Sequence, residues 1–173
     1  MIRLLAQRSE LADKNGRMSQ AWWTFFSEWV RDYNKKSSQW SGDLSSHTGS
    51  TAATELTSFS IDIGKSGIAT ISLLMSATNN ANAKTIIVKA NGVDANTITL
   101  SPSTATQSVQ LILTARSASQ AYCGAVSAQN CTPTATTVAI DTTDSITVTV
   151  YGSLSVDTDT VGLESWAVSA TQG

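Results

Sequence analysis

Apolar and polar positions alternate through most of the chain from about residue 57 onward. The alternation is clearest in SITVTVY, residues 145–151, where Ile146, Val148 and Val150 would face one side of a strand. Eight or nine short strands with no helix between them predict a mainly β fold, an antiparallel jelly-roll-like β-sandwich. The expected strands, each bounded by turn-forming residues, are 57–63, 67–75, 83–90, 95–100, 106–115, 120–126, 134–140, 145–151 and 160–169.

A helical period replaces this alternation before residue 37. Asn15 and Gly16 form a turn signal, and Ser19 is suited to cap an amphipathic α-helix that continues to about residue 34. Two neighbouring apolar stripes cover more than half of this helix, which is more aromatic surface than a lone helix can bury. We therefore expect an anchor or oligomer interface there. Its residues are Trp22, Phe25 and Trp29 in one stripe and Trp23, Phe26, Val30 and Tyr33 in the other.

The segment between these two regions is SSQWSGDLSSHTGSTAATEL, residues 37–56. Its Ser, Thr and Gly content is typical of a linker. The expected organisation is therefore a helical anchor or oligomerisation segment at 1–36, a linker at 37–56 and a β-sandwich domain at 57–173.

Composition supports the β assignment and limits the partners. Charged residues make up 14% of the chain, against roughly 25% in typical soluble domains, and 25 Ser and 24 Thr take their place. Thr is β-branched and favours strands. The net charge of -2 gives no general attraction to nucleic acid, although residues 1–36 carry +3 and residues 37–173 carry -5. No apolar stretch is long enough for a membrane span, and MIRLLAQRSELADKNG lacks the apolar core of a signal peptide.

Candidate catalytic groups are sparse, so we expect no enzyme activity, no catalytic residues, no metal site and no cofactor. The single histidine, His47, falls in the Ser-rich segment that we expect to be flexible. Acidic pairs occur at Asp141 with Asp144 and at Asp157 with Asp159, where turns between strands favour local hydrogen bonds over acid–base catalysis. A surface calcium site near the second pair stays open as an alternative.

Two cysteines, Cys123 and Cys131, lie close together in AYCGAVSAQNCTP. Their spacing would permit a disulfide that closes a small loop in an oxidising environment, and it equally fits two neighbouring free thiols. Metal binding would need further ligands that this stretch does not supply.

Three stretches resemble a group of small β-rich structural proteins of tailed bacteriophages. They are TNNANAKTIIVKANG at 78–92, LTARSASQ at 113–120 and DTTDSITVTVYGSLSVDTDTVGLESWAVSA at 141–170. The resemblance covers roughly residues 60–170. The positions that carry it are Asn79, Asn80, Asn82, Lys84, Thr85, Arg116, Gln120, Asp159, Thr160, Leu163 and Glu164.

The N-terminal region is similar to a second phage pattern, in which an Asp-x-Asn-Gly turn precedes a short Trp-rich and Phe-rich helix. DKNGRMSQAWWTFFSEWV, residues 13–30, follows it. Together the two resemblances imply a virion structural protein with a jelly-roll-like domain, frequently trimeric. The cysteine pair is a departure from this pattern.

These observations leave three functions open. The first is a homotrimeric short tail fibre or appendage, made in the host cytoplasm and carried in the virion, whose helix binds a tail, portal-proximal or capsid protein. The second is a capsid decoration protein, and the third is a carbohydrate-binding module that recognises a host surface glycan. Aromatic candidates for the third in the β domain are Phe59, Tyr122, Tyr151 and Trp166, although Trp166 is better placed for a core position.

Overall fold

A computed structural model describes residues 22–24, 26–27 and 36–173. The chain divides into two compact units, residues 1–36 and residues 37–173. In the first unit, the described residues 22–24 and 26–27 are helical. Phe25, Trp29, Val30 and Tyr33 of the expected interface lie outside the described residues.

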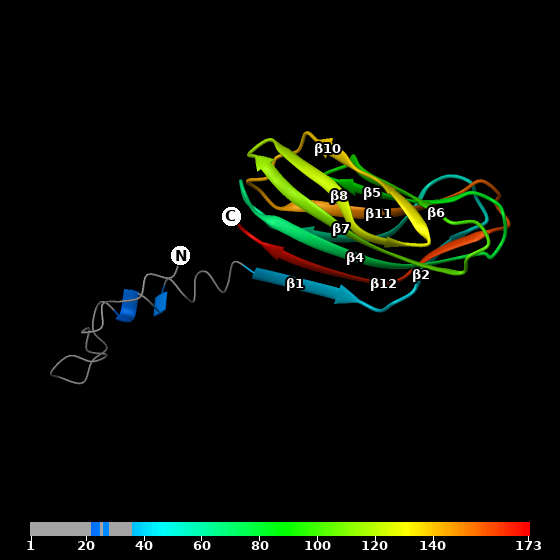
Figure 1. Cartoon of the computed structure of the whole chain (residues 1–173), viewed down its shortest axis with the longest axis horizontal. Coiled ribbons are helices and arrows are strands. Elements are labelled where there is room, and N and C mark those ends of the chain that lie inside the picture. Colours follow the sequence, from blue (N-terminus) through cyan, green and yellow to red (C-terminus); the bar gives the residue numbers. More distant parts are fainter. Residues whose placement is uncertain (1–21, 25, 28–35) are drawn as a thin grey trace. The chain divides into compact units, whose positions relative to one another are not determined.

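The second unit is an antiparallel β-sandwich, as the alternation predicts (Figure 1). Its larger sheet has the strand order β1-β12-β4-β7-β8-β10, with β2 also pairing with β12, and its smaller sheet has the order β3-β11-β5-β6-β9. The bounds are β1 Lys36–Ser41, β2 Ser45–Thr48, β3 Thr54–Ile61, β4 Ile68–Ala77, β5 Lys84–Ala90, β6 Val93–Leu100, β7 Thr106–Ser117, β8 Gln120–Gln129, β9 Cys131–Thr134, β10 Thr136–Val138, β11 Ile146–Leu154 and β12 Thr160–Thr171.

The core lies between the two sheets and follows the period of two. In β5 and β11, buried and more exposed side chains alternate along the strand. Ile146, Val148 and Val150 are buried as expected, whereas Thr147, Thr149 and Tyr151 face outward. Each sheet therefore buries one face and leaves the other available to solvent.

The expected linker at 37–56 requires correction, because it contains most of β1, all of β2 and the beginning of β3. Both β1 and β2 pair with β12 at the edge of the larger sheet, as Figure 1 shows for β1. Backbone pairing with β12 supplies the hydrogen bonds of these strands, so a Ser-rich sequence can form them without a continuous apolar face. His47, expected in a flexible segment, is buried in β2 opposite Val161.

Candidate functional site

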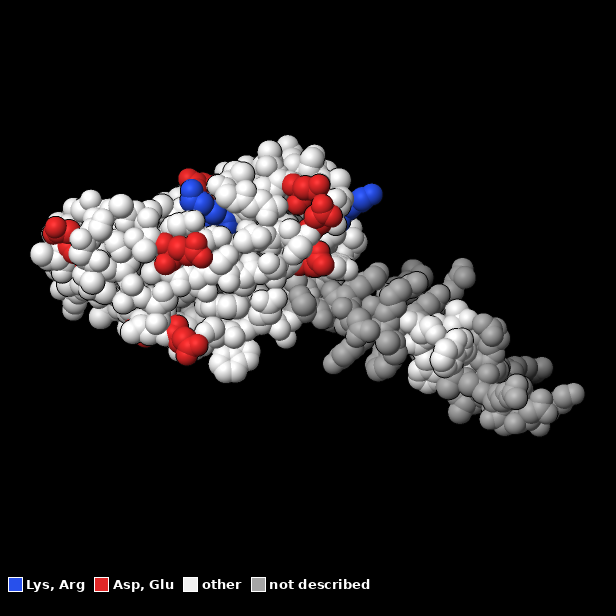
Figure 2. Space-filling model, turned by 180° about the vertical axis from the view of Figure 1, so that it is seen from behind, with Lys and Arg blue, Asp and Glu red and all other residues white. Residues whose placement is uncertain are grey.

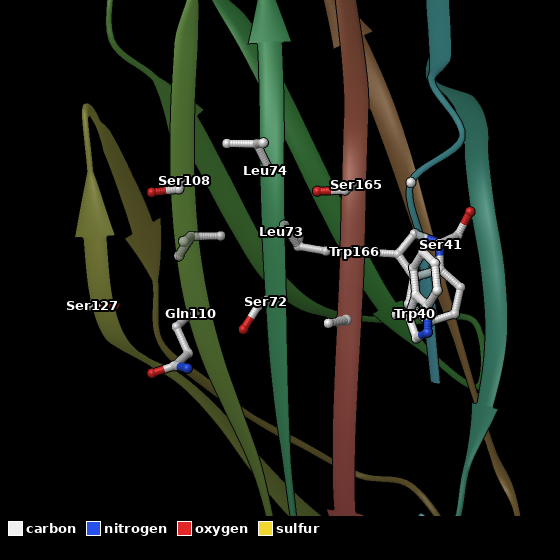
Figure 3. Close-up of a pocket in the computed structure, with 13 residues that line it drawn as sticks. Trp40, Ser41, Ser72, Leu73, Leu74, Ser108, Gln110, Ser127, Ser165 and Trp166 are labelled. Carbon is white, nitrogen blue, oxygen red and sulfur yellow. The ribbon is translucent and has the colours of Figure 1, made fainter. Parts of the chain in front are cut away.

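The outer face of the larger sheet carries a groove of about 620 Å³. It crosses from β1 over β12, β4 and β7 to β8, a span of roughly 19 Å at the usual strand separation. Figure 3 shows the side chains that project toward this face, among them Ser72, Leu74, Ser108, Gln110 and Ser165. An opening of this volume falls within the range of small-molecule sites.

Strand pairing places these side chains in rows across the sheet. Ser72 of β4 lies opposite Ala167 of β12 and Gln110 of β7. In the next row, Leu74 lies opposite Ser165 and Ser108. A bulge in β12 between Leu163 and Ser165 brings Ser165 to the outer face and turns Trp166 toward the interior.

Trp40 borders the groove on the β1 side. Its neighbour Gln39 donates a hydrogen bond from Nε2 to the carbonyl oxygen of Ser60, 2.9 Å away on β3. Alternation along β1 therefore sends Trp40 to the other side of the strand, and its side chain is 80% exposed. Sequence reasoning missed this residue because it stands in the segment expected to be a linker. An isolated Trp within a polar stretch was the available signal.

The four aromatic residues of the β domain that the sequence suggested for glycan binding have partners of other kinds. Phe59 is buried and stacks on Trp166 with ring centroids 4.4 Å apart, so Trp166 is partly buried and packs against the core at the groove's base. The guanidinium of Arg116 lies 5.1 Å from the Tyr122 ring, and Lys89 Nζ lies 5.6 Å from the Tyr151 ring.

A buried polar cluster joins the loops before β5 and β12. Asn80 donates from Nδ2 to Asp159 Oδ1 at 2.7 Å, and Lys84 Nζ lies 3.4 Å from Asp159 Oδ2 while donating to the Asn80 side chain and the Asn82 carbonyl. Burial acts to raise the pKa of Asp159, but the amides of Asn80 and Asn82 and the Lys84 charge outweigh it and lower that pKa. Residues from two separate stretches of the sequence, 78–92 and 141–170, thus contact each other in one buried cluster.

The remaining candidate chemistry is local. Asp141 accepts hydrogen bonds from the backbone and hydroxyl of Thr143, which lower the Asp141 pKa, as expected for a turn aspartate. Within the described residues, the buried Nε2 atom of His47 has no hydrogen-bond partner. No group of three or more His, Cys, Asp or Glu side chains in the described part of the chain could hold a metal ion.

Cys123 and Cys131 are both free thiols in this structure. They lie on different sheets: Cys123 in β8 faces the core, and Cys131 in β9 donates from Sγ to the Ser108 carbonyl at 3.4 Å. Burial raises the pKa of Cys123 to about 11, against a smaller lowering by Asn96, and burial also raises the pKa of Cys131.

The described part of the expected helical interface is aromatic and partly accessible. Trp22 and Phe26 lie one turn apart with ring centroids separated by 5.8 Å. Trp23 is 60% exposed. None of the described helical residues belongs to a helix long and apolar enough to cross a membrane.

Comparison with known proteins yields no family model and no curated protein that matches the chain. Solved structures match at low similarity. Lectin I from Ulex europaeus is 12% identical over 79% of this chain and 98% of the lectin, with a TM-score of 0.39. The CBM2 module of the evolved Dit protein of Lactobacillus casei BL23 phage J-1 is 8% identical over 65% and 67%, with a TM-score of 0.35. The VP2 subviral particle of infectious bursal disease virus is 16% identical over 78% and 32%, with a TM-score of 0.39. No ligand or role is transferred from proteins this distant.

Proposed function

We propose that this chain is a structural protein of a bacteriophage virion, a trimeric short tail fibre or appendage subunit joined to the particle through its N-terminal aromatic segment. The observation that carries the proposal is the exposed aromatic surface of the first unit. Trp23 is 60% exposed, although the second unit already has a complete core of its own. Aromatic surface that its own fold leaves accessible is typical of an interface.

The resemblance of residues 13–30 and of roughly residues 60–170 to phage virion proteins supports the same role. Three copies of the aromatic segment could bury one stripe against each other in a symmetric trimer and leave the second stripe for another virion protein. In this arrangement the β-sandwich is the outward domain, and no catalytic step is assigned to it.

The role of the aromatic segment is testable with a matched pair of exposed tryptophans. We expect Trp23→Glu to shift the full chain from trimer toward monomer, because a carboxylate would lose its hydration in the interface between the helices. Sedimentation equilibrium measures the molar mass of the assembly. Trp40→Glu is the control, since Trp40 lies in the other unit, and it should remain trimeric. A chain lacking residues 1–35 keeps all of β1 and should be a folded monomer that no longer joins particles. Trimers of this truncated form would overturn the anchor role.

A capsid decoration protein is the alternative within the same class, because it would use the same interface on a repeating lattice. Copy number relative to the major capsid protein, measured by quantitative mass spectrometry of purified particles, separates the two. A number close to that of the capsid lattice would favour decoration, and a number close to that of the tail appendages would favour the fibre.

A further inference from the structure

The groove on the larger sheet combines three properties that its own fold does not require. The first is the exposure of Trp40, whose indole is 80% accessible at the edge of the opening. An exposed indole on a strand is unfavourable unless it gains a partner, because it leaves a large apolar ring in water. Apolar surface continues beside the polar side chains of the groove, where Leu74 is 39% exposed and Ala167 is also exposed.

The second property is the unused hydrogen-bonding capacity of the groove. Among the described residues, the side chains of Ser72, Gln110 and Ser165 make no hydrogen bond to the protein. Two other hydroxyls of the groove do have partners. Ser108 Oγ donates to Gln129 Oε1 at 3.4 Å, and Ser41 Oγ donates to Asp43 Oδ2 at 3.4 Å and accepts from the Asp43 backbone N–H at 3.2 Å. Hydroxyl and amide groups both donate and accept, so these side chains suit a ligand that carries donors and acceptors in close succession.

The third property is neutrality. None of the residues that line the groove is charged, and the lining consists of Ser, Gln, Gly, Ala, Leu, Val and Trp. A charged ligand would lose its hydration there without gaining an opposite charge, whereas an uncharged polar ligand would not. The roughly 19 Å span over five strands further selects a ligand that is extended.

We propose that this groove is a binding site for a neutral, extended oligosaccharide, with Trp40 stacking on one sugar ring and Ser72, Gln110 and Ser165 bonding to sugar hydroxyls. A sugar chain matches all three properties, because each ring has an apolar face and a rim of uncharged hydroxyls. A peptide fits less well, because peptide-binding grooves usually have deep apolar pockets for side chains, whereas this groove is shallow and lined mainly by small side chains. The inference depends only on the β-sandwich and is independent of the proposed assembly role.

The test uses the full chain and two sets of soluble polymers. The neutral set is dextran, β-1,3-glucan, galactomannan and arabinogalactan, and the anionic set is alginate and chondroitin sulfate. Affinity electrophoresis identifies a polymer that retards the protein, and titration calorimetry with oligosaccharides of that polymer gives the dissociation constant. We expect at least one neutral polymer to bind and Trp40→Ala to weaken its binding by roughly tenfold or more, because removing a tryptophan that stacks on the ligand has effects of that size.

Control variants separate loss of the site from loss of the fold. Trp23→Ala removes the exposed indole of the other unit and should leave binding unchanged, whereas Gln110→Ala should weaken binding without altering the melting temperature. Binding to none of the neutral polymers, preference for an anionic polymer, or unchanged affinity in Trp40→Ala would each overturn the proposal. Because glycan binding and trimer formation are read by different assays, failure of one leaves the other intact.

Discussion

Strands of both sheets carry Ser and Thr side chains, but the two outer faces of the sandwich use their polar groups differently. On the smaller sheet, the hydroxyls of Ser58 and Thr149 are 3.3 Å apart, and Lys89 Nζ lies 3.0 Å from Asp94 Oδ1 and 5.6 Å from the Tyr151 ring centroid. On the larger sheet, the groove leaves Trp40 exposed beside side chains without protein partners. Hydroxyl content alone therefore does not mark a binding face. What distinguishes the larger sheet is the capacity that its fold leaves unused.

Charge separates the faces in the same sense. On the smaller sheet, Lys89 of β5 pairs with Asp94 of β6, whereas none of the residues that line the groove is charged. Figure 2, which shows the side turned away from the viewer in Figure 1, has acidic and basic side chains scattered over the β unit. The groove thus suits a neutral partner.

Filling the groove should have the largest effect on binding. Ser72 lies at its centre between Ala167 and Gln110, so Ser72→Tyr would occupy the space of the ligand. Thr99→Tyr is the matched control on the smaller sheet, where Thr99 is exposed and opposite Thr85. Both changes suit a strand, since Tyr has a high β propensity. Calorimetry with the neutral oligosaccharide should show binding lost in the first variant and retained in the second. Loss in both, or in neither, would remove the distinction between the faces.

The Lys84–Asp159 and Lys89–Asp94 ion pairs should differ strongly in their effect on stability. Lys84 and Asp159 have side chains 3% and 4% exposed, whereas Asp94 on the smaller sheet is 64% exposed. Asp159→Asn leaves a buried ammonium without its anion, so we expect the melting temperature to fall by several degrees. Asp94→Asn should lower the free energy of unfolding by no more than about 1 kcal/mol. Calorimetric melting of both variants beside the parent chain checks this order, and equal effects would contradict it.

The pH dependence of the Asp159 effect has a definite sign. Its pKa is lowered in the folded chain, so its ionised form stabilises the fold above the ordinary value of 3.8, and this contribution is lost as the pH falls below that value. The difference in melting temperature between the parent chain and Asp159→Asn should therefore be constant near neutral pH and shrink in acid. A difference that widens below pH 3.8 would refute the assignment.

The reactivity of the two cysteines shows whether their thiols, which lie on different sheets, are free or joined by a disulfide. Because burial raises the pKa of Cys123 to about 11, its thiol should resist iodoacetamide at neutral pH in the folded chain. Cys131 is only half-buried and should react first, and both should react after denaturation. Mass spectrometry of alkylated peptides measures this order. A linked Cys123–Cys131 peptide under non-reducing conditions would instead show that the bond forms.

The sequence predicts the sandwich well because its information is local. Strands β5, β7 and β11 repeat the two-residue alternation, as in Ile146, Val148 and Val150, so periodicity finds them. The run expected at 134–140 is divided between β9 and β10. Strands β1 and β2 escape this reasoning, because they are short edge strands defined by pairing with β12, more than a hundred residues away in the sequence.

The sequence does not predict the groove or the Asn80–Lys84–Asp159 cluster for the same reason. Trp40 acquires its place only when β1 joins β12, and the bulge that exposes Ser165 depends on the pairing of β12 with β4. Asn80 and Asp159 bond across 79 positions of sequence. The resembling stretches contained both residues, but no local pattern indicates that they touch. Long-range pairing, which composition and spacing do not encode, decides these sites.

The smallest expected effect concerns the paired face itself. Lys89→Met keeps the aliphatic stem of Lys89 but removes its charge from Asp94 and from the Tyr151 ring. Because both partners are accessible to water, each contact contributes little, and we expect the free energy of unfolding to change by less than about 1 kcal/mol. Lys84→Met is the internal control, since the same change within the buried cluster should cost more. Urea denaturation of both variants measures the contrast. If Lys89→Met lowered the free energy of unfolding as much as Lys84→Met, the contacts of Lys89 on the smaller sheet would contribute substantially to the stability of the sandwich, and this expectation would be wrong.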